Sequence, residues 1–311
     1  MKAEKFISTM HPKLSYSTLQ KAFRKRDIKV NGKRIGRNYM VKTGDVVEIY
    51  ITDEHLLGSV KSIITKSQMG FTVVYEDENL LLVNKKQGIP VHPDKDQVQN
   101  TLIDQVRDYL KQNRIKTERT EEFQPLLCHR LDRNTGGLTI IAKNHISHDT
   151  LLEKIEKGEI RKFYKCLVLG CPEREEALLK AHLWKDASKS KVFISHQKTT
   201  GAVNITTKYR VLKYDPTNDI SLLEVELITG RTHQIRAHMA FMGHPVLGDG
   251  KYGINSVNRK FGIKMQALWA YKLFFDFKDQ SALDYLSQRE FTVVPDFDIK
   301  RIDSLQQKFI L

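Results

Sequence analysis

The sequence predicts an α+β protein: a large domain with a mixed, largely antiparallel β-sheet flanked by helices, preceded by a small α/β module. Strand-like runs outnumber helical ones and often follow each other directly, as at 203–212 and 220–228. The length of 311 residues leaves room for one large and one small domain. A change of residue pattern at Phe71 marks where the large domain begins.

Residues 1–60 are expected to form the small module. Leu14, Leu19 and Phe23 have the spacing of one side of a short helix. "DIKVNGKRIG" then indicates two strands joined by an Asn31-Gly32 turn, and "VVEIY" indicates a third strand. A basic helix beside a small hairpin sheet is typical of nucleic-acid-binding modules, although many such faces are only solvated. The candidate contact residues are Lys21, Arg24, Lys25, Arg26 and Lys33.

Residues 61–70 are expected to be a linker, and the large domain spans 71–311. A hairpin is expected at 71–84, and apolar spacing predicts helices at 102–110 and 145–157. "IRKFYKCLVLG" alternates as a strand does, whereas "GRTHQIRAHMAFMG" has helical spacing and a glycine stop. The final "DSLQQKFIL" indicates a terminal helix.

The charge of the chain favours a polyanionic partner. There are 51 Lys and Arg residues against 37 Asp and Glu, a formal net charge of +14. Nucleic acid is the leading candidate, and a basic protein without such a partner is the alternative. No apolar run is long enough for a membrane span, and the N-terminus lacks the apolar core of a signal peptide. Three cysteines without a CxxC pair favour reduced thiols and a cytoplasmic location.

Several classes of site have no support in the sequence. His233, His238 and His244 are five and six residues apart, not the three or four that place metal ligands on one helix face. There is no GxxxxGK[ST] loop, no GxGxxG between a strand and a helix, and no GxSxG elbow. "GDGKYG" at 248–253 follows a helix and is interpreted as an ordinary glycine-rich loop. No metal or cofactor is therefore expected.

The segment "HRLDRNTGG" at 129–137 is the strongest candidate for chemistry. It holds Asp132 between Arg130 and Arg133 on what is expected to be a glycine-closed turn; a solvated charged turn is the alternative. A carboxylate beside arginine stays ionised, which suits nucleophilic attack or stabilisation of a cationic sugar centre. No second carboxylate accompanies it, so a two-carboxylate hydrolase is poorly supported. In a basic protein, the expected substrate is a nucleic acid attacked at a sugar carbon.

Four ordered segments resemble one family, the Rlu-type RNA pseudouridine synthases. "HRLDRNTGGLTIIAKN" resembles its signature H-R-L-D-x-x-T-S/G-G-L, with Gly136 where many members have serine. "VVYEDENLLLVNKKQGIPVHP", "KFYKCLVLG" and "GRTHQIRAHMAFMGHPVLGD" resemble its entry hairpin, tyrosine strand and third motif, so the likeness covers about 71–277. "LQKAFRKRDIKVNGKRIGRNYMVKTGDVVEIY" resembles the small RNA-binding module shared with ribosomal protein S-four.

The resemblance implies an RNA uridine isomerase that needs no cofactor. Asp132 corresponds to the catalytic aspartate, Arg236 to its basic partner, and Tyr164 to the tyrosine that stacks on the target base and assists the final deprotonation at C5. Arg130 corresponds to the arginine that fills the space of the flipped base. His129, Arg231 and Ile235 complete the expected RNA-binding set. The aspartate either bonds to the sugar or takes a proton from it, and both routes stay open.

Other readings remain at this point. Large-subunit ribosomal RNA is the expected target, and transfer RNA is the alternative because these motifs are common to both groups of enzymes. A non-catalytic RNA-binding or ribosome-assembly factor has no need of Asp132, Tyr164 and Arg236 together. A nucleosidase of small substrates does not explain the basic charge. A monomer is expected, because RNA provides the partner surface.

Overall fold

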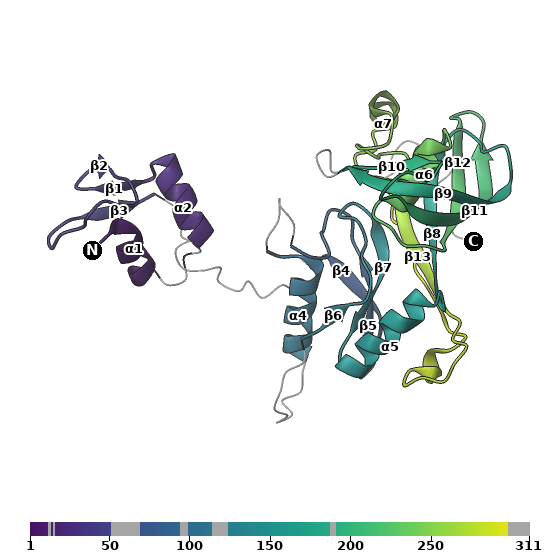
Figure 1. Ribbon diagram of the computed structural model, residues 1–311, viewed down its shortest axis with the longest axis horizontal. Helices are drawn as coiled ribbons and strands as arrows, with labels where there is room; N and C mark the ends of the chain where they lie inside the picture. The colour runs from purple at the N-terminus through teal and green to yellow at the C-terminus, as the bar shows by residue number, and fades with distance from the viewer. Residues whose placement is uncertain are drawn as a thin grey trace. The chain divides into compact units, whose positions relative to one another are not determined.

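The computed structural model describes residues 1–11, 14, 16–50, 69–93, 99–113, 124–186 and 191–297. The chain divides into two compact units, residues 1–69 and residues 70–311 (Figure 1). Most of the expected linker at 61–70, the end of the expected module at 51–60 and the expected C-terminal helix lie outside the described residues.

The N-terminal unit is a helix pair against a three-stranded antiparallel sheet. Its elements are α1 (Ala3–Met10), α2 (Tyr16–Lys25), β1 (Ile28–Val30), β2 (Lys33–Arg34) and β3 (Val47–Ile49), with strand order β2-β1-β3. The predicted hairpin is confirmed, because Asn31 and Gly32 both have positive φ, as a tight two-residue turn requires. Helix α1 was not foreseen, and it contributes Ala3 and Ile7 to the core of this unit.

The larger unit is built on an eleven-stranded sheet, which confirms the predicted fold class. Among the described residues its pairings are antiparallel, apart from one parallel contact between β7 and β13. The main path runs β10-β9-β11-β12-β8-β13-β7-β5-β4, with β14 beside β13 and β6 beside β7. The strands are β4 (Phe71–Glu76), β5 (Leu80–Lys85), β6 (Leu126–Leu127), β7 (Gly136–Ala142), β8 (Ile160–Leu169), β9 (Glu176–Asp186), β10 (Lys191–Ser195), β11 (Val203–Asp215), β12 (Ile220–Leu227), β13 (Leu268–Phe275) and β14 (Glu290–Thr292).

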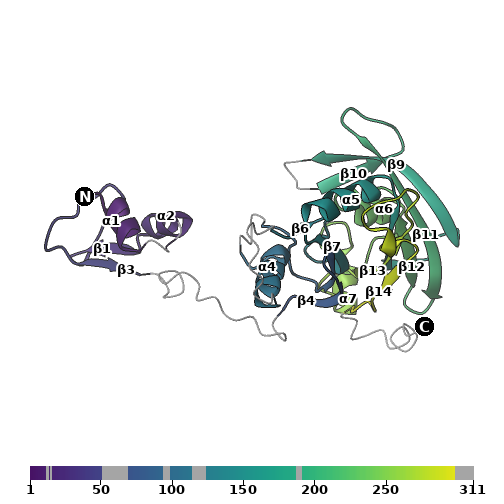
Figure 2. The same cartoon turned by 90° about the horizontal axis from the view of Figure 1, so that it is seen from below.

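Helices cover parts of this sheet. They are α4 (Leu102–Asn113), α5 (His145–Glu156), α6 (Gln234–Phe241), α7 (Asn255–Phe261) and the short 3-10 helix η2 (Asp284–Leu286). The predicted helices at 102–110, 145–157 and near 235 are therefore confirmed. The strands β9, β11 and β12 curve around α6 (Figures 1 and 2), and Ala237 of α6 packs against Ile205 of β11. None of the helices within the described ranges has both the length and the apolar character that crossing a bilayer requires.

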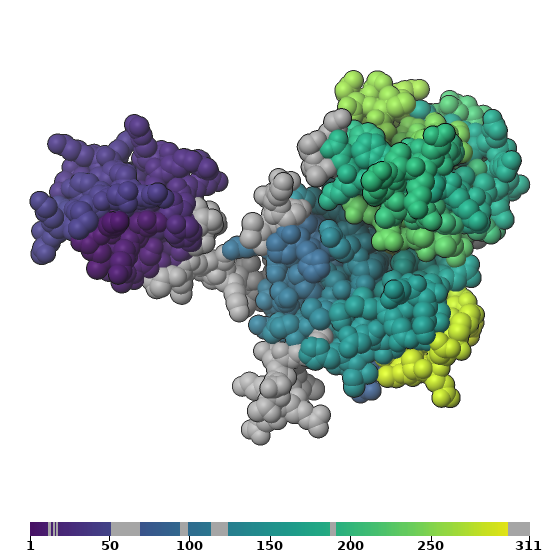
Figure 3. All heavy atoms as spheres, in the orientation of Figure 1, coloured from purple at the N-terminus to yellow at the C-terminus, as the bar shows by residue number. Residues whose placement is uncertain are grey.

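The larger unit has two parts that share the sheet. In Figure 3 the blue and teal atoms of β4 to α5 gather in one part, and the green atoms of β9 to α7 gather in the other. Strand β8 lies between β12 and β13 near the middle of the strand order. Along β8, Lys162, Tyr164 and Cys166 share one face because side chains alternate along a strand. This alternation fixes which residues of β8 face the site described below.

The two glycines of "NTGG" were expected to close the turn, but they lie at the start of β7, where they allow β13 to approach closely. The turn is closed by the Thr135 amide, which donates to the carbonyl oxygen of Asp132 at 3.0 Å. Gly136 and Gly137 instead begin β7, where a Cβ atom would lie 2.3 Å from the Trp269 ring and 2.2 Å from the Ala270 carbonyl oxygen, respectively. Glycine is required here because β7 and β13 approach each other too closely for a side chain.

Gly137→Ala is therefore expected to lower the free energy of unfolding by about 3 kcal/mol, because the new methyl group meets backbone that has little freedom to move. Gly158→Ala is the matched control. Gly158 also has positive φ (73°), but its Cβ would meet nothing within 4 Å, so the expected loss is about 1 kcal/mol. Urea unfolding of both variants measures the difference, and equal losses would contradict the close approach of β7 and β13.

Candidate active site

A cleft of about 1030 Å³ opens on the side of β8 that carries Tyr164. Its walls come from both parts of the larger unit, including the turn at 129–134 and the segment 227–233. Six of its lining residues are Lys or Arg and two are Asp or Glu. The cleft is thus suited to a polyanion, with the carboxylate of Asp132 among the cations.

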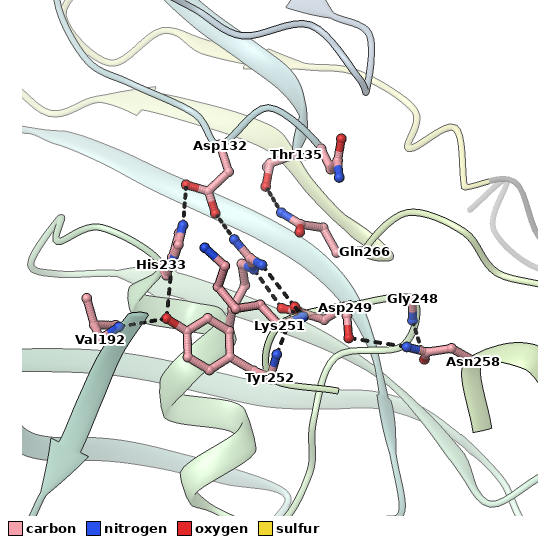
Figure 4. A network of polar contacts seen from close by, with 12 residues as sticks. Asp132, Thr135, Val192, His233, Gly248, Asp249, Lys251, Tyr252, Asn258 and Gln266 are labelled. Atoms are coloured by element: carbon pink, nitrogen blue, oxygen red, sulfur yellow. Dashed lines mark hydrogen bonds and ion pairs between the residues drawn. The ribbon is translucent and has the colours of Figure 1, made fainter. Parts of the chain in front are cut away.

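Asp132 and Arg236, which are 104 residues apart, form an ion pair in this cleft. Arg236 Nη1 donates to Asp132 Oδ2 at 2.7 Å (Figure 4). Asp132 lies on the turn between β6 and β7, and Arg236 lies in the first turn of α6. The Asp132 side chain is 25 % exposed, so one edge of the carboxylate stays accessible from the cleft.

Arg236 has a second carboxylate partner that the sequence did not reveal. Its Nε donates to Asp249 Oδ2 at 2.6 Å, and its Nη2 donates to Asp249 Oδ1 at 2.9 Å. The Asp249 side chain is fully buried. Burial acts to raise the pKa of Asp249, but the hydrogen bonds and charge of Arg236 outweigh it, so the pKa is lowered. This two-point contact fixes the plane of the guanidinium group that faces Asp132.

The loop at 248–253 was interpreted from sequence as an ordinary glycine-rich loop, which did not reveal the role of Asp249. Asp249 accepts hydrogen bonds from the amides of Lys251 and Tyr252, and its carbonyl oxygen accepts one from Asn258. The loop is therefore a rigid holder for a buried carboxylate. The available signal was an aspartate in a glycine-rich segment, which did not indicate that an arginine on another element would be its counter-ion.

Tyr164 lies beside Asp132 in the wall of the cleft. The side chain is 4 % exposed and lines a smaller pocket together with Leu131 and Ile235. Burial, aided by the negative charge of Asp132, raises the pKa of Tyr164 well above its ordinary value. Its hydroxyl group makes no hydrogen bond to any residue that the structure describes. The described residues thus leave the hydroxyl group without a hydrogen-bond partner, in the wall of the cleft.

Lys85 is a further buried group that the sequence did not single out. Its Nζ donates to the carbonyl oxygens of Lys86, Ile89 and Arg133 at 3.0, 2.8 and 3.0 Å. Burial lowers the pKa of Lys85 to about 7, and the nearby charge of Asp132 acts in the opposite direction. These contacts join the end of β5 to the turn that carries Asp132. Lys85 therefore stabilises the position of that turn.

The other residues predicted to contact RNA fall in different settings. Arg130 and Arg231 are exposed and line the cleft. His129 also lines it, but its Nε2 accepts a hydrogen bond from the Ile140 amide at 3.2 Å, and burial lowers its pKa to about 3. His129 is consequently neutral, and its hydrogen bond with the Ile140 amide stabilises the position of β7. Lys162 was not predicted; it lines the cleft, and burial lowers its pKa.

The five basic residues predicted in the N-terminal unit are all exposed: Lys21, Arg24, Lys25, Arg26 and Lys33. Within the described ranges, no group of three or more His, Cys, Asp or Glu residues is arranged to hold a metal ion.

The two carboxylates of Arg236 are expected to differ in their effect on stability. Asp249→Asn leaves the buried guanidinium group with one charged partner, and breaking a buried pair lowers the free energy of unfolding by about 3–5 kcal/mol. Asp132→Asn is the matched control, because its partly exposed site allows water to replace the lost interaction. Chemical denaturation of both variants measures the difference. A larger loss for Asp132→Asn would mean that Asp249 is not the structural anchor.

Comparison with known proteins gives a consistent result. The profile of the RNA pseudouridylate synthase family matches residues 79–241. A protein of Aquifex aeolicus (strain VF5) named "Uncharacterized RNA pseudouridine synthase" is 31 % identical over 254 residues, which cover 81 % of this chain and 77 % of that protein. "Ribosomal large subunit pseudouridine synthase C" of Rickettsia bellii (strain RML369-C) is 30 % identical over 260 residues, which cover 80 % of this chain and 82 % of that protein.

Solved structures share the fold. "Human RNA Pseudouridylate Synthase Domain Containing 1" superposes with a TM-score of 0.55 at 21 % identity, covering 78 % of this chain and 95 % of that one. "Human RNA Pseudouridylate Synthase Domain Containing 4" superposes with a TM-score of 0.56 at 22 % identity, covering 72 % and 88 %. The profile match and the relatives at 30 % identity or more identify the chain as an enzyme that belongs to the RNA pseudouridine synthase family.

Proposed function

We propose that this protein converts specific uridines of large-subunit ribosomal RNA to pseudouridine, with Asp132 as the catalytic carboxylate. The observation that carries the proposal is the Asp132–Arg236 ion pair, which lies beside Tyr164 in a cleft rich in cations. The choice of ribosomal RNA is supported by the Rickettsia relatives, whose names specify the ribosomal large subunit.

In the proposed reaction, the bond between the ribose and N1 of uracil breaks, the base rotates, and C5 bonds to the same sugar carbon. C5 then loses its proton and N1 gains one, so the product is an isomer of uridine. The sugar becomes electron-poor when that bond breaks, and a fixed anion stabilises it. Asp132 supplies this anion, either by bonding to the sugar or by taking a proton from it. Because Asp249 also pairs with Arg236, two carboxylates share one guanidinium group. The positive charge of Arg236 therefore compensates the negative charge of Asp132 only in part.

Tyr164 has a proposed role in holding the base. A flipped base stacked on a tyrosine ring gains about 1–3 kcal/mol, which offsets part of the cost of extruding it from RNA. We assign stacking on the base to Tyr164, together with the assistance in the final deprotonation at C5 that the family resemblance implies.

RNA binding is assigned to two regions. Arg130 is proposed to fill the space that the flipped base leaves, with Arg231, His129 and Ile235 around the pocket. The module at 1–60, which resembles the S-four RNA-binding module, is joined to the catalytic domain at 71–311 by the linker at 61–70. Its basic residues are proposed to contact phosphates away from the site, which adds affinity but no chemistry. The proposed enzyme is a cytoplasmic monomer.

A transfer RNA target is the second candidate, since the cleft chemistry suits any flipped uridine. Mapping pseudouridines in ribosomal and transfer RNA from cells with and without the gene separates the two targets.

The first prediction of this proposal concerns the catalytic carboxylate. Asp132→Asn keeps the shape of the side chain and removes its charge, so pseudouridine formation should fall by at least about 1,000-fold. RNA affinity should change little, because the cations of the cleft remain. Turnover is measured by release of label from C5 of uridine. The matched control is Asp149→Asn, an exposed carboxylate on α5, which should retain wild-type turnover.

The second prediction concerns the N-terminal module. Replacing Lys21, Arg24 and Lys25 with glutamine should make RNA binding depend less steeply on salt. The slope of log affinity against log salt concentration should fall in magnitude by about 0.7–0.9 for each phosphate contact removed. Turnover at saturating RNA should be unchanged, because these residues contribute no chemistry. Fluorescence anisotropy over a range of salt concentrations gives the slope.

A matched triple variant provides the control for that experiment. Arg259, Lys260 and Lys264 are also exposed and lie on or just after α7. Replacing them with glutamine removes the same charge from the other unit. An equal loss of slope in both variants would mean that general charge, and not the N-terminal module, determines the affinity.

A further inference from the structure

His233 occupies an unusual position between Asp132 and the base of α6. Its backbone is left-handed, with φ 54° and ψ 17°, which is uncommon for a residue other than glycine. Its Nε2 lies 4.0 Å from Asp132 Oδ1, and its Nδ1 lies 3.0 Å from the hydroxyl oxygen of Tyr252 (Figure 4). The ring thus spans the distance between the proposed catalytic carboxylate and a tyrosine.

The contacts of Tyr252 assign the proton on the imidazole ring. The Val192 amide, which can only donate, lies 2.9 Å from the Tyr252 hydroxyl oxygen. That oxygen accepts from Val192, and among the described residues His233 Nδ1 is the one acceptor within hydrogen-bonding distance of the hydroxyl proton, so this proton is assigned to the contact with Nδ1. A neutral imidazole that accepts at Nδ1 carries its proton on Nε2, which is the nitrogen that faces Asp132. Burial lowers the pKa of His233 despite the opposing charge of Asp132, which is consistent with a neutral ring.

The two oxygens of Asp132 are consequently held in different ways. Oδ2 makes a short charged hydrogen bond to Arg236, whereas Oδ1 faces Nε2–H of His233 at a distance beyond a direct hydrogen bond. Pairing with a cation reduces the basicity of Oδ2, so Oδ1 is the more reactive oxygen. We propose that His233 and Tyr252 form a relay that positions Asp132, in which the Nε2–H dipole of His233 attracts Oδ1, the oxygen presented to the ribose, across 4.0 Å without a direct hydrogen bond.

The surroundings of the relay keep it in one arrangement. The rings of His233 and Tyr252 are in edge contact, with centroids 5.6 Å apart. The Arg236 guanidinium group and Lys191 Nζ lie 5.3 and 5.7 Å from the Tyr252 ring centroid. The charged groups that act on His233 are Asp132, Asp249, Arg236 and Lys251. With the tyrosine held in this way, the imidazole ring has one favoured orientation and one favoured tautomer.

The relay makes specific predictions for three variants, which rest on the proposed function. Tyr252→Phe keeps the ring but removes the proton donor to Nδ1, so kcat should fall about tenfold with KM for RNA unchanged.

His233→Asn tolerates a left-handed backbone and keeps an acceptor near Tyr252 but has no group at Nε2. Its kcat should fall about 10- to 100-fold. His233→Gln returns an N–H group near the Nε2 position and should recover part of that loss.

Controls separate positioning from folding and from RNA contact. Tyr214→Phe removes an exposed tyrosine hydroxyl on β11 that bonds to Asp219, and its kcat should match the wild type. A rise in KM with kcat unchanged in the His233 variants would overturn the relay and indicate an RNA contact. Equal kcat for His233→Asn and His233→Gln would overturn the role of Nε2–H. Wild-type kcat in Tyr252→Phe would remove Tyr252 from the relay.

A measurement that does not depend on activity distinguishes failure of the relay from failure of the proposed function. In the full-length protein with ¹⁵N-labelled histidine, NMR shifts should show His233 protonated at Nε2 and unprotonated at Nδ1. Tyr252→Phe should mix the two tautomers. A wild-type ring protonated at Nδ1 would overturn the relay, even if the protein forms pseudouridine. A protein with the expected tautomer but no pseudouridine product would keep the relay and overturn the proposed function.

Discussion

The structure around the cleft depends on one guanidinium group shared by two carboxylates. Arg236 joins the turn that carries Asp132 to the loop that carries Asp249. Removing charges from water is costly, so a buried arginine is retained only where carboxylates satisfy it. With one positive and two negative charges, the group of three keeps a net negative charge of one. Asp132, which carries part of that charge, lines a cleft in which Lys and Arg outnumber Asp and Glu, the arrangement that the proposed function needs.

Much of this arrangement could be predicted from the sequence, and the rest could not, for physical reasons. Local residue patterns determine local structure. The sequence therefore predicted the Asn31-Gly32 hairpin, the apolar faces of helices α4 and α5, and the alternation of side chains along β8. The pairing of Asp132 with Arg236 was foreseen only through resemblance to a family, because 104 residues separate them. Asp249, Lys85 and His233 were missed, since each acquires its role from tertiary contacts with segments far away in the sequence. A buried aspartate in a glycine-rich loop resembles an exposed one until the fold brings an arginine to it.

The glycine pair of "NTGG" shows how a correct motif can have a wrong explanation. The turn needs only the Thr135 amide, whereas Gly136 and Gly137 are required by the neighbouring strand. The bulky side chain of Trp269 lies where the Cβ of residue 136 would be, so glycine and tryptophan at these two positions are complementary.

The strand order has a consequence for how the protein is made. Strand β13 lies between β7 and β8, yet it follows β8 in the sequence by about 100 residues and β7 by about 125. Strand β13 connects β7, which follows Asp132, with β8, which carries Tyr164. The sheet therefore cannot join β7 to β8 until residues 268–275 leave the ribosome. Until then, two strand edges stay unpaired in the nascent chain, and contacts this distant in sequence form slowly. A chain that lacks residues 268–275 therefore cannot bring the turn of Asp132 and the strand of Tyr164 together through this sheet.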